Sequence, residues 1–552
     1  MSRVRIPQLG PIVGHTTATS CRLWIRADDP GDRDGELAED SRTIGVITVL
    51  DDAGQADPQR TYYFRLAREF DRTGTFHLGV DRSFRIGQPD DGQPIPPAAG
   101  EPAPLEPDTE YRVKMGVLLL DDDFENDAMV DSRVLLDKLP PAHVWAQELA
   151  ALSPEQSEAT FRTFPKDPVQ HLSFLLGSCR YPGLFWKAKE ADVIFKPMLD
   201  RLRSQAETCV PRFVLMVGDQ IYADKMNRLP LGLADTYEEF QERYQSAFGS
   251  RNMRALLRSA PQYMILDDHE IEDNWTQDRI RRQDKRLLFN MAIGAYMSYQ
   301  WSHGPRTYGR RLYYSFECGG FPFFVLDTRT ERFMDDVEGE LTDNHLLGRP
   351  CADPAYPSQI DMVCAWLRRQ QQTHGNRPKF VVSPTVFVPN DVSTAGSPEH
   401  QNASDSWEAF PSTRKQLLDT IVAHSVQNVV FLSGDIHCTC VAELRFSGSP
   451  AAEQLKAFAI TSSAFYWPFP FADGAPSGYV HDSQTEEDSF PLSRNIVMNY
   501  QAKNFTQEDN FCQVDIDWKK TQLIVRAFGQ DGALLHKGIS KEPLITTLTL
   551  AP

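Results

Sequence analysis

The sequence has no long apolar segment, and its basic residues are few compared with its acidic ones. Its longest apolar runs, such as Phe213–Val217 and Phe321–Leu326, fall far short of the roughly 18 residues that cross a bilayer, so we expect no transmembrane segment. The 57 lysines and arginines are outnumbered by 76 aspartates and glutamates, which gives a formal net charge of −19. This excess of negative charge argues against a stable nucleic-acid partner, because binding a phosphate backbone requires a basic surface.

Cysteine is scarce, and the number of cysteines is odd. Nine cysteines spread over 552 residues fit reduced thiols better than a disulfide framework. Residues 1–20 contain neither the apolar stretch of about 7 to 15 residues that a Sec signal needs nor the paired arginines of a twin-arginine signal. Both observations lead us to expect a cytoplasmic protein.

The length and composition are those of a folded protein with several domains. At roughly 150 residues per domain, 552 residues allow two to four domains. The apolar fraction of 41% and the charged fraction of 24% are ordinary for globular proteins. Disorder or a fibrous structure is therefore excluded for the chain as a whole.

Residues 1–137 have the pattern of a small antiparallel β-sandwich. Short segments rich in β-branched and aromatic residues are separated by Gly, Pro and Asp clusters. The predicted strands are Thr17–Ile25, Thr43–Leu50, Thr61–Leu66 and Tyr111–Leu120. The proline-rich segment Gln88–Pro107 is predicted to be a loop, since proline cannot donate a hydrogen bond to a strand ladder. Residues 138–170 are predicted to form a linker with one short helix.

Residues 171–552 alternate between apolar runs of strand length and segments of helical length, which predicts an α/β domain with buried sheets. The predicted strands are Leu172–Leu176, Phe213–Val217, Tyr263–Leu266, Phe323–Leu326, Phe380–Val382, Val429–Leu432 and Ala457–Ile460. The predicted helices are Trp186–Gln205, Thr236–Arg258, Asp278–Trp301, Asp361–Thr373 and Ser412–Ser425. Ser412 is expected to be the N-cap of the last helix.

Several of these strands are followed directly by polar, reactive residues. The segments are Gly177–Arg180, Gly218–Asp224, Asp267–Asp273, Asp327–Arg332 and Ser433–His437. A single aspartate after a strand is usually a turn former or a helix cap. Five such segments together predict one shared site, because ligands of α/β sheets bind beyond the carboxyl ends of the strands.

The residue types in these segments favour metal chemistry. Carboxylates crowded into one site repel one another unless cations lie between them. Thiol and imidazole donors suit softer ions, whereas carboxylates suit hard ions such as calcium. We therefore expect a site that holds more than one kind of metal.

Six motifs in this order resemble the PhoD-type alkaline phosphatases of the metallophosphoesterase superfamily. They are LLGSCR, MVGDQIYAD, ILDDHEIEDNW, FFVLDTRTERF, DSWEAFPSTR and VVFLSGDIH. The N-terminal segments GPIVGHTTATSCRLWIRA and LEPDTEYRV resemble the β-sandwich domain that precedes the catalytic domain in that family. The resemblance implies a four-layer α/β/β/α catalytic domain at residues 171–552 and phosphoester hydrolysis at a cluster of ferric iron and calcium, or of manganese, magnesium or zinc instead.

The resemblance also implies site residues. By motif, the metal ligands would be Cys179, Asp219, Tyr222, Asp435 and His437. Asp219 is the candidate to bridge two ions, because one carboxylate can present an oxygen to each. Where the wider superfamily has an Asn-His pair, this chain has Asp268 and His269, so either Asp268 or Asn274 completes the coordination.

Three further residues are candidates for contact with the phosphate. His269 is expected to assist the leaving oxygen, the alternative being a capped structural histidine. Arg180 and Arg329, together with Arg332, are candidates for holding phosphate oxygens. The alternative is that these arginines form surface ion pairs.

Two other features have competing interpretations. Cys438 and Cys440 form a CxC pair, but a single pair is weak evidence for zinc, and period-two spacing makes both packing residues of a strand. The aromatic segment Ala464–Phe471 either lines the site or covers the core.

The resulting functional prediction is a phosphoester hydrolase in which a metal-activated hydroxide attacks phosphorus. The substrate would be a small phosphoester, a phospholipid or a nucleotide. One alternative is an intracellular nuclease or phosphodiesterase that uses the same metal site. The other is a binding protein on a metallophosphoesterase scaffold.

Overall fold

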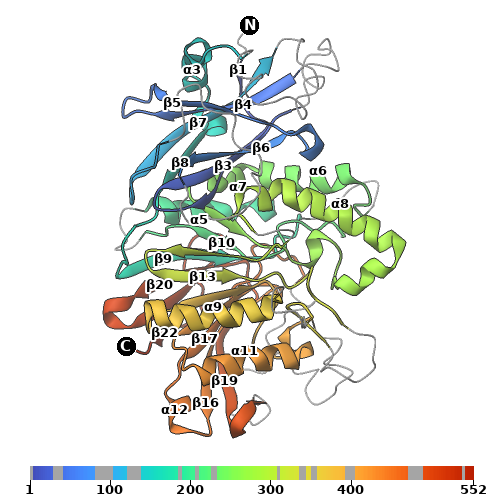
Figure 1. The fold of residues 1–552 in the computed structure, drawn as a ribbon, viewed down its shortest axis with the longest axis vertical. Coiled ribbons are helices and arrows are strands. Elements are labelled where there is room, and N and C mark those ends of the chain that lie inside the picture. The colour runs from blue at the N-terminus through green and yellow to red at the C-terminus, as the bar shows by residue number, and fades with distance from the viewer. Residues whose placement is uncertain are drawn as a thin grey trace. The chain divides into compact units, whose positions relative to one another are not determined.

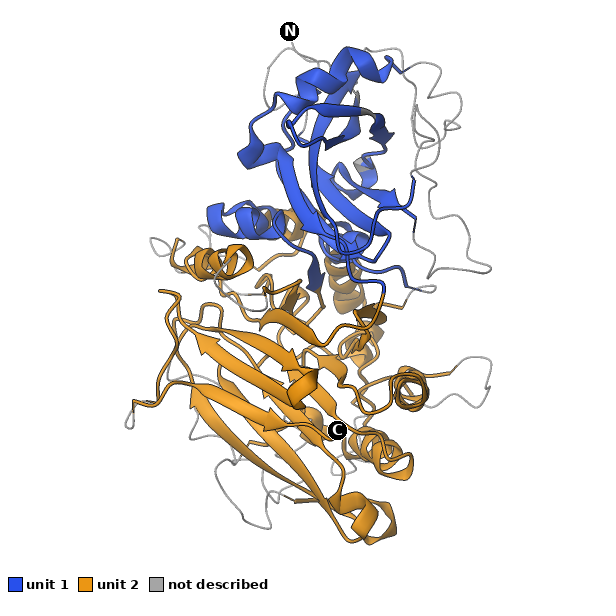
Figure 2. Ribbon diagram, turned by 90° about the vertical axis from the view of Figure 1, so that its left-hand side faces the viewer, with its two compact units in different colours: residues 1–166, 244–263, 294–308 blue, residues 167–243, 264–293, 309–552 orange. Residues whose placement is uncertain are grey.

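The computed structural model describes residues 4–28, 42–80, 103–120, 139–183, 189–204, 210–224, 233–307, 311–334, 344–349, 357–391, 405–469, 489–537 and 541–552. The chain divides into two compact units (Figure 2). Unit 1 comprises residues 1–166, 244–263 and 294–308, and unit 2 comprises residues 167–243, 264–293 and 309–552. Unit 1 is thus built from three separate stretches of the sequence.

Unit 1 contains two antiparallel sheets. The larger has the order β1-β7-β4-β5, with β8 pairing with β7, and the smaller has the order β2-β3-β6. Their strands are β1 (Val4–Arg5), β2 (Leu9–Thr16), β3 (Ser20–Arg26), β4 (Arg42–Leu50), β5 (Ala56–Phe64), β6 (Thr73–Gly79), β7 (Glu110–Leu120) and β8 (Glu158–Arg162). One hydrophobic cluster contains Leu23 and Phe76 of the smaller sheet together with Ile47 and Met115 of the larger. Apolar faces of both sheets therefore contribute to one core.

The four strands predicted in residues 1–137 are confirmed, but three others, β1, β2 and β6, were missed. β1 has only two residues, and glycine and polar residues interrupt the apolar runs of β2 and β6. The segment predicted as a linker contains α3 (Ala142–Ala150), α4 (Pro154–Ser157) and strand β8. Of the predicted loop Gln88–Pro107, residues 103–107 lie outside any strand and the rest lies outside the described residues.

Unit 2 contains two larger mixed sheets. The first has the order β11-β10-β9-β20-β21-β22 and the second the order β12-β13-β14-β15-β17-β16-β19-β18. The first is formed by β9 (His171–Gly177), β10 (Val214–Met216), β11 (Gln262–Met264), β20 (Phe511–Asp517), β21 (Gln522–Phe528) and β22 (Ile545–Thr549). The second is formed by β12 (Tyr314–Cys318), β13 (Phe321–Val325), β14 (Lys379–Ser383), β15 (Val429–Ser433), β16 (Thr439–Ser447), β17 (Ala457–Thr461), β18 (Ser489–Pro491) and β19 (Val497–Thr506).

Four of the five polar segments follow strands with parallel neighbours, namely β9, β10, β13 and β15. β9 pairs in parallel with β10, and β13, β14, β15 and β17 form a continuous parallel set. All seven predicted strands of this region are confirmed, because each is a buried apolar run. The later antiparallel strands, such as β16, β19, β20 and β21, were not predicted. The fold of the described residues is thus mixed α/β with several sheets.

Two helices of unit 2 pack against the second sheet. α9 (Gln359–His374) and α11 (Pro411–Ala423) pack side by side (Figure 1), and Leu367 and Leu417 join Phe431 of β15 in one hydrophobic cluster. The prediction of Ser412 as N-cap is wrong. Pro411 occupies the first turn and Phe410 the cap position, because proline at the start of a helix requires no amide hydrogen.

The remaining predicted helices are confirmed with shifted ends. The region Trp186–Gln205 contains α5 (Phe195–Arg203), with residues 184–188 outside the described residues. The region Thr236–Arg258 contains two helices, α6 (Tyr237–Gly249) and α7 (Arg251–Leu257), and the region Asp278–Trp301 contains α8 (Gln283–Tyr299). In the described part of the chain, no helix is both long enough and apolar enough to cross a membrane.

Candidate metal centre

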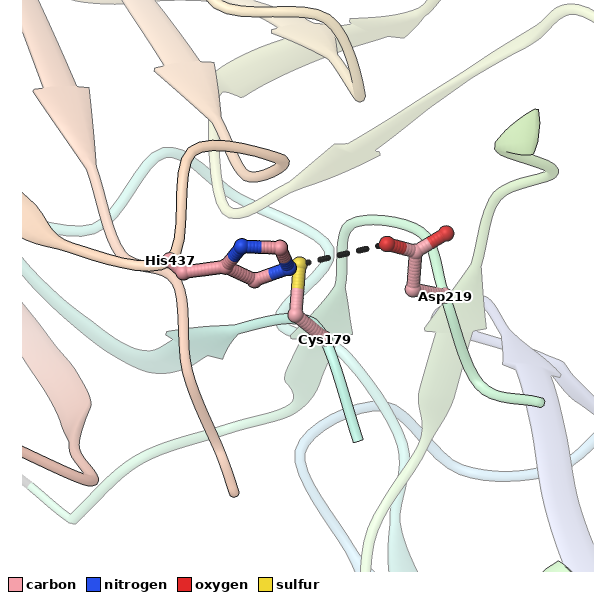
Figure 3. Close-up of side chains that lie close together, drawn as sticks. All are labelled: Cys179, Asp219 and His437. Atoms are coloured by element: carbon pink, nitrogen blue, oxygen red, sulfur yellow. Dashed lines mark hydrogen bonds between the residues drawn. The ribbon is translucent and has the colours of Figure 1, made fainter. Parts of the chain in front are cut away.

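Polar segments from several strand ends meet at one place in unit 2. Cys179 follows β9, Asp219 follows β10, and His437 follows β15. Ligand atoms of these three side chains lie within 4.8 Å of one another, and Figure 3 shows the side chains pointing toward one another. Residues that are 40 to 258 positions apart are therefore brought together, as the strand-end argument predicted.

The backbone at this place is strained. Five residues with side chains have φ angles in the left-handed region: Cys179 (58°), Asp219 (55°), Asn274 (54°), Asp435 (73°) and His437 (50°). Such conformations are unfavourable for residues other than glycine, each by roughly 1–3 kcal/mol, and they cluster at functional sites. The resemblance implies a ligand role for four of the five, and Asn274 is the alternative to Asp268, so the strain falls where a function was expected.

The Cys179 thiol lies among hydrogen-bonding partners. Its Sγ donates to Asp219 Oδ2 at 3.4 Å and accepts from Ser463 Oγ at 3.0 Å. The Tyr222 hydroxyl donates to the same Asp219 oxygen at 3.2 Å and lies 3.4 Å from His437 Nε2. Burial and the Asp219 carboxylate raise the pKa of the Cys179 thiol and of the Tyr222 hydroxyl well above their usual ranges. A bound cation would reverse these shifts by favouring thiolate and phenolate.

Asp219 belongs to two of the candidate ligand groups. Besides the group with Cys179 and His437, its carboxylate lies within 4.8 Å of ligand atoms of Asp268 and His269. Within the described residues, its buried Oδ1 atom has no hydrogen-bond partner. Burial raises the pKa of Asp219 well above its usual range. A buried carboxyl oxygen without a donor fits a metal ligand, and the double membership fits a bridging position.

Another group of candidate metal ligands consists of carboxylates alone. Asp267, Asp268 and Asp435 have carboxyl oxygens within 4.8 Å of one another. Burial raises the pKa of Asp267 to about 7 and that of Asp435 well above its usual range. At Asp268 burial also favours the neutral acid, but Arg329 and His269 outweigh it and lower the pKa. Oxygen donors of this kind fit a hard divalent cation.

The guanidinium of Arg329 is engaged by carboxylates. Its Nε donates to Asp267 Oδ1 at 2.5 Å, and its terminal nitrogens donate to both oxygens of Asp405 at 2.8 and 2.7 Å. Arg332 forms a second ion pair with Asp405. Both arginines are buried, so neither forms the surface ion pair considered above. Phosphate contact by Arg329 stays a prediction.

Arg180 lies in a different environment. Its guanidinium lies 5.8 Å from the centroid of the Phe195 ring and interacts electrostatically with Asp192. Burial lowers its pKa to about 10. The Arg180 guanidinium therefore lies near α5 and the turn before it, while its backbone N–H donates to the Asp219 carbonyl at 3.0 Å. Phosphate contact by Arg180 also stays a prediction.

His269 is held between carboxylates and an aromatic ring. Its Nδ1 lies 2.9 Å from both oxygens of Asp224, and its ring stacks on Tyr222 with centroids 4.3 Å apart. Burial opposes protonation of His269, but Asp268, Asp219 and Asp224 raise its pKa well above the usual range. These carboxylates therefore favour the protonated imidazole.

Asn274 lies at the edge of the carboxylate group. Its backbone N–H donates to Asp268 Oδ2 at 2.6 Å. Its amide nitrogen, turned to face Asp405, lies 3.1 Å from Asp405 Oδ1. Asp268 belongs to two candidate groups, but the geometry leaves both Asp268 and Asn274 as predicted ligands.

The aromatic segment after β17 lines the site. The Trp467 ring stacks on the His437 imidazole, with centroids 3.5 Å apart and an angle of 7° between the planes. Trp467 and Tyr222 also belong to one hydrophobic cluster with Tyr181 and Phe469. Trp467 therefore shields His437 from solvent, which favours the first of the two interpretations of this segment. Residues 470 and 471 lie outside the described residues.

The two residues of the CxC pair, Cys438 and Cys440, are buried. Cys438 packs with Val386 and Ile436 in a hydrophobic cluster, and Cys440 lies in β16. Burial raises the pKa of both thiols. Both thiols are therefore buried as expected of packing residues, but only Cys440 lies in a strand, because β16 begins at Thr439.

Sequence reasoning missed five residues that shape the site. Asp224, Asp267 and Glu270 lie within motifs already quoted and hold His269, Arg329 and backbone N–H groups respectively. Asp405 opens the DSWEAFPSTR motif, and Trp467 lies in the aromatic segment. Their partners are distant in sequence, so only their residue types and their places in motifs could have indicated them.

Comparisons with known proteins identify the family of this chain. The family model described as PhoD-like phosphatase matches residues 196–526. Alkaline phosphatase D of Bacillus subtilis (strain 168) is 24% identical over 221 residues, which is 38% of this chain and 36% of that protein. This match thus spans about a third of the length of the curated relative.

A solved structure described as the structure of PhoD superposes with a TM-score of 0.60 at 16% identity, covering 99% of this chain and 89% of the other. At this identity the superposition shows a shared fold. The family model, however, covers more than half of the chain and includes the segments that carry Asp219, Asp268 and His437. The chain therefore belongs to the PhoD-like phosphatase family.

Proposed function

We propose that this protein is a metal-dependent hydrolase of phosphoesters, of the alkaline phosphatase or phosphodiesterase type. The observation that carries the proposal is Asp219, a buried carboxylate that belongs to two adjacent groups of candidate ligands. A shared carboxylate is the arrangement that holds two cations at a fixed spacing. Membership of the family supports the same activity.

We further propose that the ions are ferric iron and calcium. Cys179, Tyr222 and His437 would hold the iron, and Asp435 with Asp268 or Asn274 would hold the calcium, with Asp219 between them. When bound, such ions neutralise phosphoryl charge and lower the pKa of a coordinated water. The orphaned Asp219 oxygen and the mixed soft and hard donors support this assignment.

The side chains around the ions have separate tasks in this proposal. Asp224 holds the Nδ1 atom of His269, and the Nε2 atom lies 3.7 Å from Asp273 Oδ1. In this proposal, Nε2 is the atom that donates a hydrogen bond to a leaving oxygen. Arg329 supplies positive charge beside Asp267 and Asp268. Trp467 limits the access of water to His437.

The layers of unit 2 are proposed to follow the order α/β/β/α. Phe174 of β9 contacts Phe323 of β13 and Phe380 of β14, each with ring centroids 5.5 Å apart, which supports face-to-face packing of the two sheets. Arg201 of α5 stacks on Phe528 of β21, which supports a helical layer on the first sheet. The core shared by the two sheets of unit 1 supports an N-terminal β-sandwich.

The substrate class is a proposal that rests on the sequence and the family. A small phosphoester, a phospholipid or a nucleotide would suit the site. Cytoplasmic localisation and the absence of a stable nucleic-acid partner stay predictions from composition.

Chromogenic substrates test the activity. We expect the full-length protein, supplied with iron and calcium, to hydrolyse para-nitrophenyl phosphate, bis-para-nitrophenyl phosphate or both, and the ratio of the two kcat/KM values gives its monoester or diester preference. A diester preference would identify the phosphodiesterase alternative. A fully metallated sample that hydrolyses neither would contradict the proposal and favour a binding protein on the same scaffold.

A further inference from the structure

Glu270 joins the two segments that carry the central carboxylates. The side chain is fully buried, and its two oxygens accept three backbone N–H groups. Oε1 accepts from Gln220 at 2.7 Å, and Oε2 accepts from Asp267 at 2.9 Å and from Asp219 at 3.3 Å. The segment after β10 and the segment after β11 are therefore tied to one carboxyl group.

An ordinary helix cap explains only one of these three bonds. Glu270 ends a short 3₁₀ helix (η5, Asp268–Glu270), and Asp267 at its N-cap exchanges hydrogen bonds with Glu270 in a capping box. The bonds to the Asp219 and Gln220 amides lie outside this motif, about fifty residues away along the chain. They require a second explanation.

The backbone at residues 218–220 is shaped to bind an anion. Gly218 has φ 101° and Asp219 has φ 55°, and successive amides in such a turn can converge on one negative group. Here the group is the Glu270 carboxyl. The two segments also touch directly, because a Cβ atom added to Gly218 would lie 2.6 Å from Asp267 Cβ. Little room is left for Asp219 to move relative to Asp267.

We propose that Glu270 is a positioning residue that fixes the Asp219 carboxylate relative to Asp267 and Asp268, and so sets the spacing of the two cations. We name this arrangement the Glu270 clamp: Glu270 with the amides of Asp219, Gln220 and Asp267. The inference rests on the proposed function. Its physical basis is that Asp219 holds an unfavourable backbone conformation. The hydrogen bonds from the Asp219 and Gln220 backbone N–H groups to Glu270 stabilise this conformation.

The substitution Glu270→Gln tests the clamp with little change of volume. One carboxyl oxygen becomes an amide nitrogen, which cannot accept, so at least one of the three N–H groups loses its partner. Outer-shell changes of this kind typically weaken metal affinity or activity by roughly 10- to 100-fold. We expect such a loss in both kcat/KM and the amount of calcium and iron retained after dialysis, measured by mass spectrometry. Amide hydrogen exchange in residues 216–224 should also become about tenfold faster.

Two further variants separate the clamp from other effects. Glu272→Gln is the matched control, since Glu272 pairs with Arg279 and Lys285 outside the site, and it should behave as wild type. Glu270→Asp keeps the charge but is one methylene shorter. It should still cap Asp267, yet lose metal and exchange faster at residues 216–224.

The outcomes separate this inference from the proposed function. Glu270→Asp replaces Glu270→Gln in this test if the first variant does not fold. If the variant retains its metal within twofold of wild type and its amide hydrogens exchange at the wild-type rate, the clamp is wrong even though the enzyme is active. If wild type hydrolyses no phosphoester, the proposed function fails, while retained metal and hydrogen exchange still decide the clamp.

Discussion

The two halves of the candidate metal centre reduce the repulsion between buried acidic groups in different ways. We call Cys179, Asp219 and His437 the thiolate half, and Asp267, Asp268 and Asp435 the carboxylate half. In the thiolate half, burial keeps the Cys179 thiol and the neighbouring Tyr222 hydroxyl protonated. In the carboxylate half, Arg329 pairs with Asp267 and Asp268.

The difference has consequences for metal binding. A cation that enters the thiolate half displaces protons, so its affinity should rise steeply with pH. Trp467 covers His437 in that half, which should slow the release of a bound ion. In the carboxylate half the donors are hard oxygen atoms that lie beside the positive charge of Arg329. A hard cation bound there should therefore exchange readily. Asp219 belongs to the thiolate half but also contacts Asp268, so it couples the two.

Removing this coupling should have the largest effect. In the Asp219→Asn variant, a neutral amide replaces a carboxylate that serves both halves. We expect kcat/KM to fall on the order of 1,000-fold or more, beyond the roughly 10- to 100-fold loss typical of outer-shell changes. Asp200→Asn, at an exposed residue of α5 that pairs with Lys196, should leave the rate unchanged. An Asp219→Asn variant with full metal content and at least half the wild-type rate would refute the bridging role.

Selective chelation should distinguish the halves directly. Mild treatment with a calcium-selective chelator should lower hydrolysis to below about one hundredth of its starting rate while iron stays bound, because oxygen sites exchange faster than a shielded thiolate site. Added calcium should restore the activity. Should activity persist when elemental analysis finds no calcium, the assignment of two different metals would be wrong.

The sequence indicated the donors of each half more reliably than their supports. The convergence of the segments that carry Cys179, Asp219 and His437 could be predicted because each follows a buried apolar strand, and parallel strands end on the same side of a sheet. Their ligand roles are implied by the family resemblance. Glu270 and Asp405 could not, since their partners are backbone amides and arginines that are distant in sequence. Charge and residue type identify a ligand, whereas a positioning residue is identified only by the fold.

The strands that could be predicted from the sequence also differ from those that could not. The parallel strands β9, β10 and β13 to β15 are continuous apolar runs, which makes them visible in the sequence. β19 and β21 alternate buried and partly exposed residues over much of their length, and each is preceded only by a 3₁₀ turn of three residues, so the strand–helix pattern did not reveal them. The N-terminus of α11 was misplaced because Pro411, a favourable first residue, precedes the apparent cap Ser412.

Tyr222→Phe probes the thiolate half alone. The phenolate of Tyr222 on ferric iron would give a visible charge-transfer band, so the pure metallated protein should be coloured. The variant should lose this band and weaken iron binding about tenfold, with a rate loss no larger than that. Tyr314→Phe is the matched control, because Tyr314 is buried in the same unit and donates to the Met264 carbonyl at 2.9 Å. A colourless active wild type, together with unchanged iron content in Tyr222→Phe, would remove Tyr222 from the ligands.

The smallest expected effect concerns stability rather than rate, and it tests the carboxylate half without metal. Burial raises the pKa of Asp267 from its ordinary 3.8 to about 7, so between these values the folded protein holds a proton that the unfolded chain releases. Stability of the metal-free protein should therefore be greatest near the lower value and fall as the pH rises to 7, by on the order of a few kcal/mol. Asp219 and Asp435 act in the same direction, while the lowered pKa of Asp268 acts only below this window.

Thermal unfolding of the metal-free protein at pH 5 and pH 8 measures this effect. The melting temperature should be higher at pH 5. The Asp267→Asn substitution should reduce the difference, because a neutral amide cannot release the proton that the Asp267 carboxyl loses near pH 7 in the folded protein. Saturating calcium should also reduce the difference, since a bound cation stabilises the ionised carboxylates and returns their pKa values toward the range of the unfolded chain. A metal-free protein that melts at the same or a higher temperature at pH 8 would show that Arg329 already balances the carboxylate half, and the contrast between the halves would then lie in their donor atoms alone.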